Sequence, residues 1–124
     1  MAVDYRTTLK TTRMTAVRDD IDSGAGAGFI EICSASYAAV LATITLADPC
    51  GTVTTDTLTF TMPQSDSSAD NTGTAAVARI KESGGTTVVN NLTVGTSGAN
   101  INLNSLSITS GGTVTLSSGT LVHG

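Results

Sequence analysis

Aromatic and charged residues are both scarce in this sequence of 124 residues. It has no tryptophan, two tyrosines and two phenylalanines, and 13% of its residues are charged, against ~25% in an average globular protein. Carbohydrate-binding modules present aromatic platforms to sugar rings, so the scarcity of aromatics argues against that class. Six basic residues face ten acidic ones, which argues against nucleic acid as a partner because phosphate binding needs a dense basic surface.

Long hydrophobic runs are also missing. The longest apolar-leaning stretch, residues 37–47, is interrupted by Thr43 and Thr45 and is far shorter than the ~20 residues of a membrane-spanning helix. No apolar stretch follows the first ten residues, so we expect no secretory signal, no membrane association and synthesis in a cytoplasm. Cysteine is rare as well. Cys33 and Cys50 are expected to be small buried or half-buried thiols, and the sequence leaves open whether they pair.

The sequence offers little for catalysis or metal binding. Its one histidine, His123, is the penultimate residue, and no Cys-x-x-Cys pair is present, so neither a zinc site nor a histidine-activated nucleophile is expected. The glycine-rich segment 23–28 follows a helical pattern and precedes a strand, the reverse of the order in nucleotide-binding loops. We therefore predict that the protein is not an enzyme, with no catalytic residue, no cofactor and no metal.

Two acidic groups stand out. Residues 65–71 include Asp66, Asp70 and Asn71, which are residue types that bind calcium, but their spacing is not that of an EF-hand loop. The simpler interpretation of this segment is a solvent-facing turn. The second group, at the expected helix end, is interpreted as a solvated helix terminus; it consists of Asp19, Asp20 and Asp22.

Threonine and serine dominate instead, with 23 and 13 copies. From residue 29 onward apolar residues alternate with threonines, as in Leu58, Phe60 and Met62, which is typical of strands with one buried face. Turn signals such as Gly84-Gly85 separate these runs. The expected strands are residues 29–34, 40–46, 57–62, 73–81, 86–90, 92–94, 101–103, 106–108, 113–116 and 120–122.

Short strands at this spacing predict a mainly β fold, an antiparallel β-sandwich for which a jelly roll is one arrangement, preceded by one N-terminal helix. We assign residues 1–28 to an N-terminal arm, the helix and a glycine-rich connection, and residues 29–124 to the β-sandwich, all within a single compact domain. Sheet edges with so few charges tend to pair with other chains, so the sequence favours a subunit of an assembly.

Residues 4–22 are the helical candidate. Asp4 can cap its start and Gly24 can end it, and the pattern is clearest over residues 13–22, because threonines weaken the first half. The apolar residues fall on two sides. One side has Tyr5, Leu9 and Ala16, and the other has Met14, Val17 and Ile21. Either both sides pack on the sheet of the same chain, or one of them contacts a neighbouring subunit.

Three stretches, taken together and in order, resemble a family of small structural proteins of tailed bacteriophages, and the resemblance covers most of the chain. The strand after the second stretch reads Ala-Ala-Val-Ala-Arg-Ile where relatives tend to carry large aromatics, which implies a slimmer core or a different contact there. The stretches are residues 13–28 leading into 29–32, residues 65–75, and residues 94–104 followed by 108–114.

The resemblance implies a non-enzymatic virion protein, a capsid decoration or cement subunit made in the host cytoplasm. Such a subunit binds the outer surface of the head, bridges major capsid proteins and forms a homotrimer. From the sequence we expect the partner contacts in the arm and helix, at Tyr5, Arg6, Leu9 and Arg13. The alternatives are a tail, neck or fibre component of the virion, and a carbohydrate-binding β-sandwich module.

Overall fold

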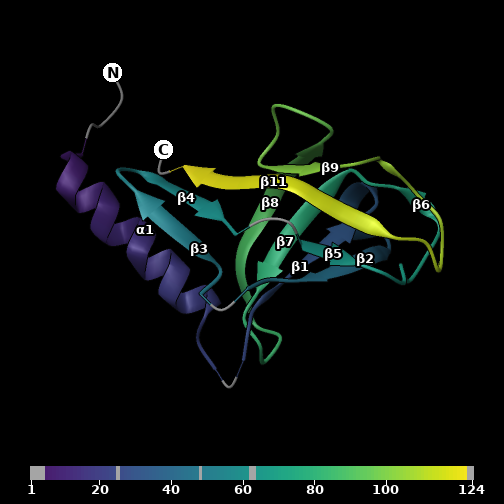
Figure 1. The fold of residues 1–124 in the computed structure, drawn as a ribbon, viewed down its shortest axis with the longest axis horizontal. Coiled ribbons are helices and arrows are strands. Elements are labelled where there is room, and N and C mark those ends of the chain that lie inside the picture. The colour runs from purple at the N-terminus through teal and green to yellow at the C-terminus, as the bar shows by residue number, and fades with distance from the viewer. Residues whose placement is uncertain (1–4, 25, 48, 62–63, 123–124) are drawn as a thin grey trace.

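The computed structural model describes residues 5–24, 26–47, 49–61 and 64–122. In this part of the chain one α-helix, α1 (Thr7–Ile21), precedes a series of strands that curl around a common interior (Figure 1). A short 3-10 helix, η1 (Ala35–Tyr37), follows the first strand. The strands are β1 (Phe29–Cys33), β2 (Val40–Thr45), β3 (Gly51–Thr54), β4 (Thr57–Phe60), β5 (Gln64–Asp66), β6 (Gly73–Thr74), β7 (Val77–Lys81), β8 (Thr87–Gly95), β9 (Ile101–Leu103), β10 (Ser107–Ile108) and β11 (Val114–Val122).

Most of the strands belong to one curled, mixed sheet that forms a half-barrel. The strand order is β2-β1-β7-β8-β9-β11-β4-β3, with β5 paired to β11 beside this path, and β6 and β10 form a separate ladder. The prediction of a mainly β, sandwich-like fold preceded by one N-terminal helix is confirmed. The parallel pairing of β8 with β9 departs from a wholly antiparallel sheet.

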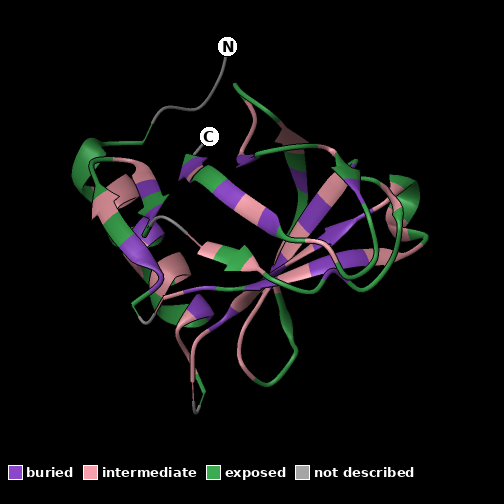
Figure 2. Cartoon of the chain, turned by 45° about the vertical axis from the view of Figure 1, so that its right-hand side comes forward, coloured by how far each residue is buried: buried purple, intermediate pink, exposed green. Residues whose placement is uncertain are grey.

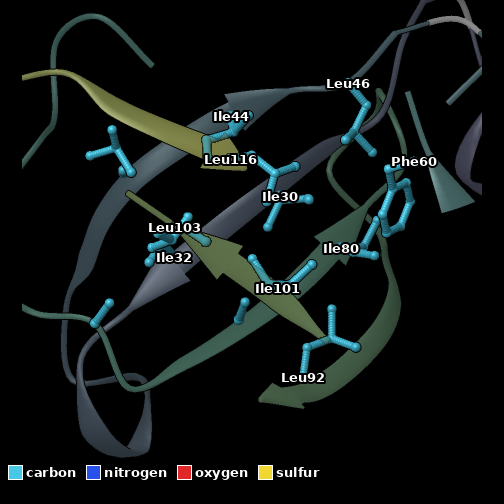
Figure 3. Packing of buried hydrophobic residues seen from close by; sticks show 14 of the residues in the cluster. Ile30, Ile32, Ile44, Leu46, Phe60, Ile80, Leu92, Ile101, Leu103 and Leu116 are labelled. Atoms are coloured by element: carbon cyan, nitrogen blue, oxygen red, sulfur yellow. The ribbon is translucent and has the colours of Figure 1, made fainter. Parts of the chain in front are cut away.

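The core lies inside the curl of the sheet because apolar residues alternate along the paired strands. In the β1–β7 ladder, Ile30 pairs with Ile80 and Ile32 with Ala78, and all four side chains are fully buried. Figure 3 shows side chains from β1, β2, β4, β7, β8, β9 and β11 converging on this interior. Full burial of an isoleucine or leucine contributes ~1.5–3 kcal/mol, so the shared interior is the main source of stability.

Helix α1 packs against the β3–β4 hairpin and lies within the predicted helical segment, residues 4–22, including most of its threonine-rich first half. It begins at Thr7 although threonine is a weak helix former, and threonine hydroxyls in it donate to carbonyls four residues earlier; Thr15 Oγ1, for example, donates to Thr11 O over 2.8 Å. Asp4, the expected cap, lies outside the described residues. The side with Met14 and Ile21 is buried on the sheet, whereas Tyr5 and Ala16 of the other side are exposed.

Several strand boundaries differ from the expected ones. Strands β3 and β5 fall in segments that the sequence pattern assigns to turns or loops. β3 forms because Thr55, with a φ of 56°, closes a tight hairpin onto β4 without a glycine to mark the turn. Strands β8 and β11 each join two expected strands, whereas residues 73–81 split into β6 and β7. Met62 and Pro63, expected at a strand end, lie outside the described residues.

The acidic segment 65–71 covers the free edge of β2, which corrects its interpretation as a plain solvent-facing turn. Asp66 Oδ2 accepts a hydrogen bond from Thr43 N at 3.0 Å. Leu41 O accepts from Asp70 N at 2.8 Å, and Asn71 Nδ2 donates to the Val40 carbonyl oxygen at 2.7 Å. Because β5 also pairs with β11, this segment links the two sides of the curled sheet.

Candidate interaction site

Of the four predicted contact residues, Tyr5 and Arg6 directly precede α1, and Leu9 and Arg13 lie in its first half. Figure 2 shows that the start of the helix is largely exposed. Tyr5 is 36% exposed, Arg6 and Arg13 are exposed, and Leu9 is half-buried. The Arg13 guanidinium lies 4.6 Å from the centre of the Tyr5 ring, within the range of a cation–π contact. The structure therefore brings Tyr5 and Arg13 into direct contact and places Arg6 as the N-cap residue beside them.

The N-cap and most of the length of α1 carry basic side chains. Four of the six basic residues of the sequence fall between residues 6 and 18, and that span contains no acidic residue. Arg6, at the N-cap, opposes the helix dipole, whereas Arg18, in the last turn, favours it, so helix stability does not explain the basic residues at the start of α1. The exposed end of α1 thus combines an aromatic ring with positive charge.

A second polar cluster lies on the outer face of the sheet. Arg79 Nε donates to Glu31 Oε1 over 2.6 Å, and Lys81 Nζ lies 3.1 Å from the same oxygen. Burial by itself raises the pKa of Glu31, but the hydrogen bonds and charges of Arg79 and Lys81 outweigh it and hold the pKa below its ordinary value. The hydrogen bond to Glu31 in turn raises the pKa of Arg79.

Strained backbone supports this cluster. Ser36 and Tyr37 in η1 and Asn91 in β8 have φ values of 58°, 58° and 60°, in the left-handed region. The Tyr37 hydroxyl accepts a hydrogen bond from Asn91 N over 2.8 Å, and its ring lies 5.0 Å from the Arg79 guanidinium. Sequence reasoning did not single out these residues. The sequence did contain one signal for this cluster. Glu31 and Arg79 have opposite charges, and each lies at a polar position of a segment in which apolar and polar residues alternate.

Both cysteines are buried and free, in agreement with the expectation of buried thiols. Burial raises the pKa of Cys33, and burial together with the Asp22 carboxylate raises the pKa of Cys50 to about 12. Both thiols are therefore protonated at neutral pH and are poor nucleophiles. Asp22 also accepts a hydrogen bond from Cys50 N at 3.0 Å, so this residue anchors the helix end and is not simply solvated.

A third feature is an apolar hollow of about 290 Å³ between α1, β8 and β11. Asn100 is the one residue with a polar side chain among those that line it. Sequence reasoning did not foresee the hollow, because its walls come from three segments far apart in the chain. The apolar lining consists of Met14, Val17, Val89, Leu92, Leu121 and Val122.

The described residues contain no cluster of three or more histidine, cysteine, aspartate or glutamate side chains that could hold a metal ion. His123 lies outside them. Within the same residues, no helix has the length and apolar character to cross a membrane. The described surface has two features suited to contacts with other molecules: a basic and aromatic helix end, and an apolar hollow. In comparisons with protein-family models, with curated proteins and with solved structures, nothing matches this chain.

Proposed function

We propose that this chain is a non-enzymatic structural protein of a bacteriophage virion, a decoration or cement subunit on the outer surface of the head. The observation that carries the proposal is the exposed, basic and aromatic end of α1, which projects from a charge-poor β body. The resemblance of three sequence stretches to small phage virion proteins supports the same role. The proposed partners are the major capsid protein and further copies of the chain in a homotrimer.

The contact end of α1 is suited to binding a protein surface. Tyrosine and arginine are the residues most enriched at the energetic centres of interfaces. The stacking of Arg13 on Tyr5 orders both side chains before binding, which lowers the entropy lost in the complex. A subunit that binds only the mature shell stabilises that shell by mass action, so no catalytic group is required.

The location is tested by cryo-electron microscopy with icosahedral averaging, combined with copy-number mass spectrometry, on virions that carry this chain. We expect ordered density on the outside of the head at three-fold or quasi-three-fold positions, with the start of α1 against the shell. A low copy number together with absence from the averaged head would contradict the proposal and indicate a tail, neck or fibre component.

The contact residues are tested by binding of purified protein to heads that lack it. The double variant Tyr5→Ala/Arg13→Ala should bind at least about tenfold more weakly, because truncating interface tyrosine or arginine commonly costs ~2 kcal/mol or more. Its melting temperature should stay close to that of the wild type, because exposed substitutions change stability by only ~0.5 kcal/mol. Thr45→Ala, at an exposed position on β2 away from the helix, is the control. Unchanged binding of the double variant would exclude this end of α1 as the contact.

A further inference from the structure

The outer face of strands β3, β4 and β11 carries a regular array of threonines. The three strands are neighbours in the sheet and lie side by side in Figure 1. Their antiparallel register brings alternate residues of each strand directly opposite one another. We call the resulting array the threonine face. It consists of two rows that cross the three strands, Thr52–Thr59–Thr120 and Thr54–Thr57–Val122.

The opposite face of the same strands belongs to the core. Leu58 and Leu121 alternate with residues of the threonine face and are buried, and Val53 packs against the same cluster. Helix α1 contacts β3 and β4 from this inner side, since its buried residues belong to that cluster. On the threonine face, by contrast, Thr59 is exposed and Val122 is 58% exposed. The threonine face is therefore the surface of these strands that a partner can reach.

The threonine face is uncharged. No aspartate, glutamate, lysine or arginine occurs in the sequences of β3, β4 and β11, and Asp56 lies in the turn between β3 and β4. Charged residues are depleted at the centres of protein interfaces. A charged partner would lose its hydration against this face without gaining a counter-charge, which is costly. The surface that complements the threonine face is therefore neutral as well.

The chemistry of the threonine face makes it complementary to itself. A hydroxyl group both donates and accepts hydrogen bonds, so two such faces can satisfy each other's hydroxyls about a two-fold axis. Threonine and valine are branched and stiff at χ1, so they lose little side-chain freedom on burial. Val122 adds an apolar contact at one end. Face-to-face packing of sheets, ~10 Å apart, is the ordinary geometry of β-sandwiches.

We propose that the threonine face binds the same face of a second copy of this chain, in a two-fold pair centred on β4. The contact consists of hydroxyl hydrogen bonds between the threonines, with Val122 at its margin. This pair has two-fold symmetry, so it is distinct from the contacts that hold a homotrimer. It also forms without a capsid, so its failure and the failure of the virion role are observed separately.

Sedimentation of the intact protein over a range of concentrations tests the pairing. The wild type should dimerise as its concentration rises. Thr59→Lys, on the middle strand of the face, should weaken dimerisation about tenfold or more, because the pair then brings two like charges together and removes their hydration. Thr45→Lys makes the same change at an exposed position of β2, outside the threonine face, and should dimerise as the wild type does.

Charge reversal separates self-pairing from other modes of association. Thr59→Glu should also dimerise weakly, but an equimolar mixture of Thr59→Glu and Thr59→Lys should associate again, because opposite charges then meet. Val122→Ser, at a mostly exposed site, replaces these variants if they do not fold by circular dichroism, and it should weaken dimerisation as well.

Three results would overturn the proposal. The first is a wild type that stays monomeric at all concentrations, in which case the face is left to solvent or to a different protein. The second is equal dimerisation of Thr59→Lys and Thr45→Lys, which would place the contact elsewhere on the molecule. The third is a mixture of Thr59→Glu and Thr59→Lys that does not associate, which would show that the face does not meet its own copy.

Discussion

At the scale of single residues, Glu31 is a half-buried acidic side chain on the outer face of the sheet. It is 14% exposed and lies within bonding distance of two basic side chains on the neighbouring strand. Salt bridges on an open surface contribute little, but a partly buried carboxylate leaves two cations unpaired when it is removed. The cluster also contacts the strained η1 segment, since the Tyr37 ring packs on the Arg79 guanidinium. Its role is therefore interpreted as structural.

Glu31→Gln should lower the free energy of unfolding by ~1–3 kcal/mol at neutral pH, because charged partners are left without a counter-ion. The pKa of Glu31 is below its ordinary value of 4.5 in the folded protein. Its contribution is therefore complete above pH 4.5 and is lost as the pH falls through the folded-state pKa. Urea unfolding at a series of pH values should show a smaller loss on acidification in Glu31→Gln than in the wild type.

The control for this series is Asp70→Asn, which neutralises an exposed aspartate. It should keep the acid dependence of the wild type. The structural interpretation of the Glu31 cluster fails if Glu31→Gln and the wild type lose stability in parallel between pH 4.5 and more acidic conditions.

At the scale of elements, close backbone packing occurs within the β3–β4 hairpin and where the chain after α1 passes β7. Gly51, at the start of β3, lies so close to the backbone of Thr59 in β4 that a Cβ atom there would collide with the Thr59 carbonyl oxygen. At Gly28 a Cβ atom would lie 2.7 Å from Ile21 O and 2.8 Å from Lys81 O, where the helix end passes β7. These contacts explain why glycine occupies positions that the sequence pattern reads only as turns or connections.

Gly51→Ala should lower the free energy of unfolding by ~1–3 kcal/mol, because a methyl group forced into packed backbone shifts the hairpin. Gly26→Ala is the matched control: its Cβ atom would meet nothing within 4 Å. That control should be neutral or more stable by ~0.4–1 kcal/mol, since alanine restricts the unfolded chain. Chemical denaturation measures both. Equal stabilities of the two variants would show that β3 does not approach β4 as described.

At the scale of the whole molecule, the curled sheet is held closed by side chains and loop backbone as well as by strand pairing. Strand β2 ends the sheet on one side, and a free edge of this kind invites pairing with other chains. The segment 65–71 occupies that edge through Asp66, Asp70 and Asn71. The molecule thus protects the β2 edge.

Asp66→Ala should weaken the attachment of the segment 65–71 to the edge of β2. Its carboxylate accepts bonds from Thr43 N and Ser68 N, both at 3.0 Å, so its loss should cost ~1–3 kcal/mol and leave the Thr43 amide without its partner. Hydrogen exchange followed by mass spectrometry should show faster exchange in β2, and the variant should aggregate more readily. Ser67→Ala, an exposed neighbour in the same segment, is the control. Unaltered exchange in β2 would show that the edge is protected by other contacts.

Local pattern alone determined the mainly β content, the helix and most interior positions, including Leu58, Phe60, Met14 and Ile21. Alternation and helical spacing are relations between residues that are close in the sequence, so they can be recognised from the sequence alone. It also predicted Tyr5 and Arg13 as contact residues, and the structure places their side chains against each other at one exposed helix end. Tertiary structure alone decided the strand order, the Glu31 cluster, the closure of β2 and the apolar hollow between α1, β8 and β11. Each depends on segments far apart in sequence, and their pairing and register follow from which apolar faces can be buried together once the chain has closed on itself.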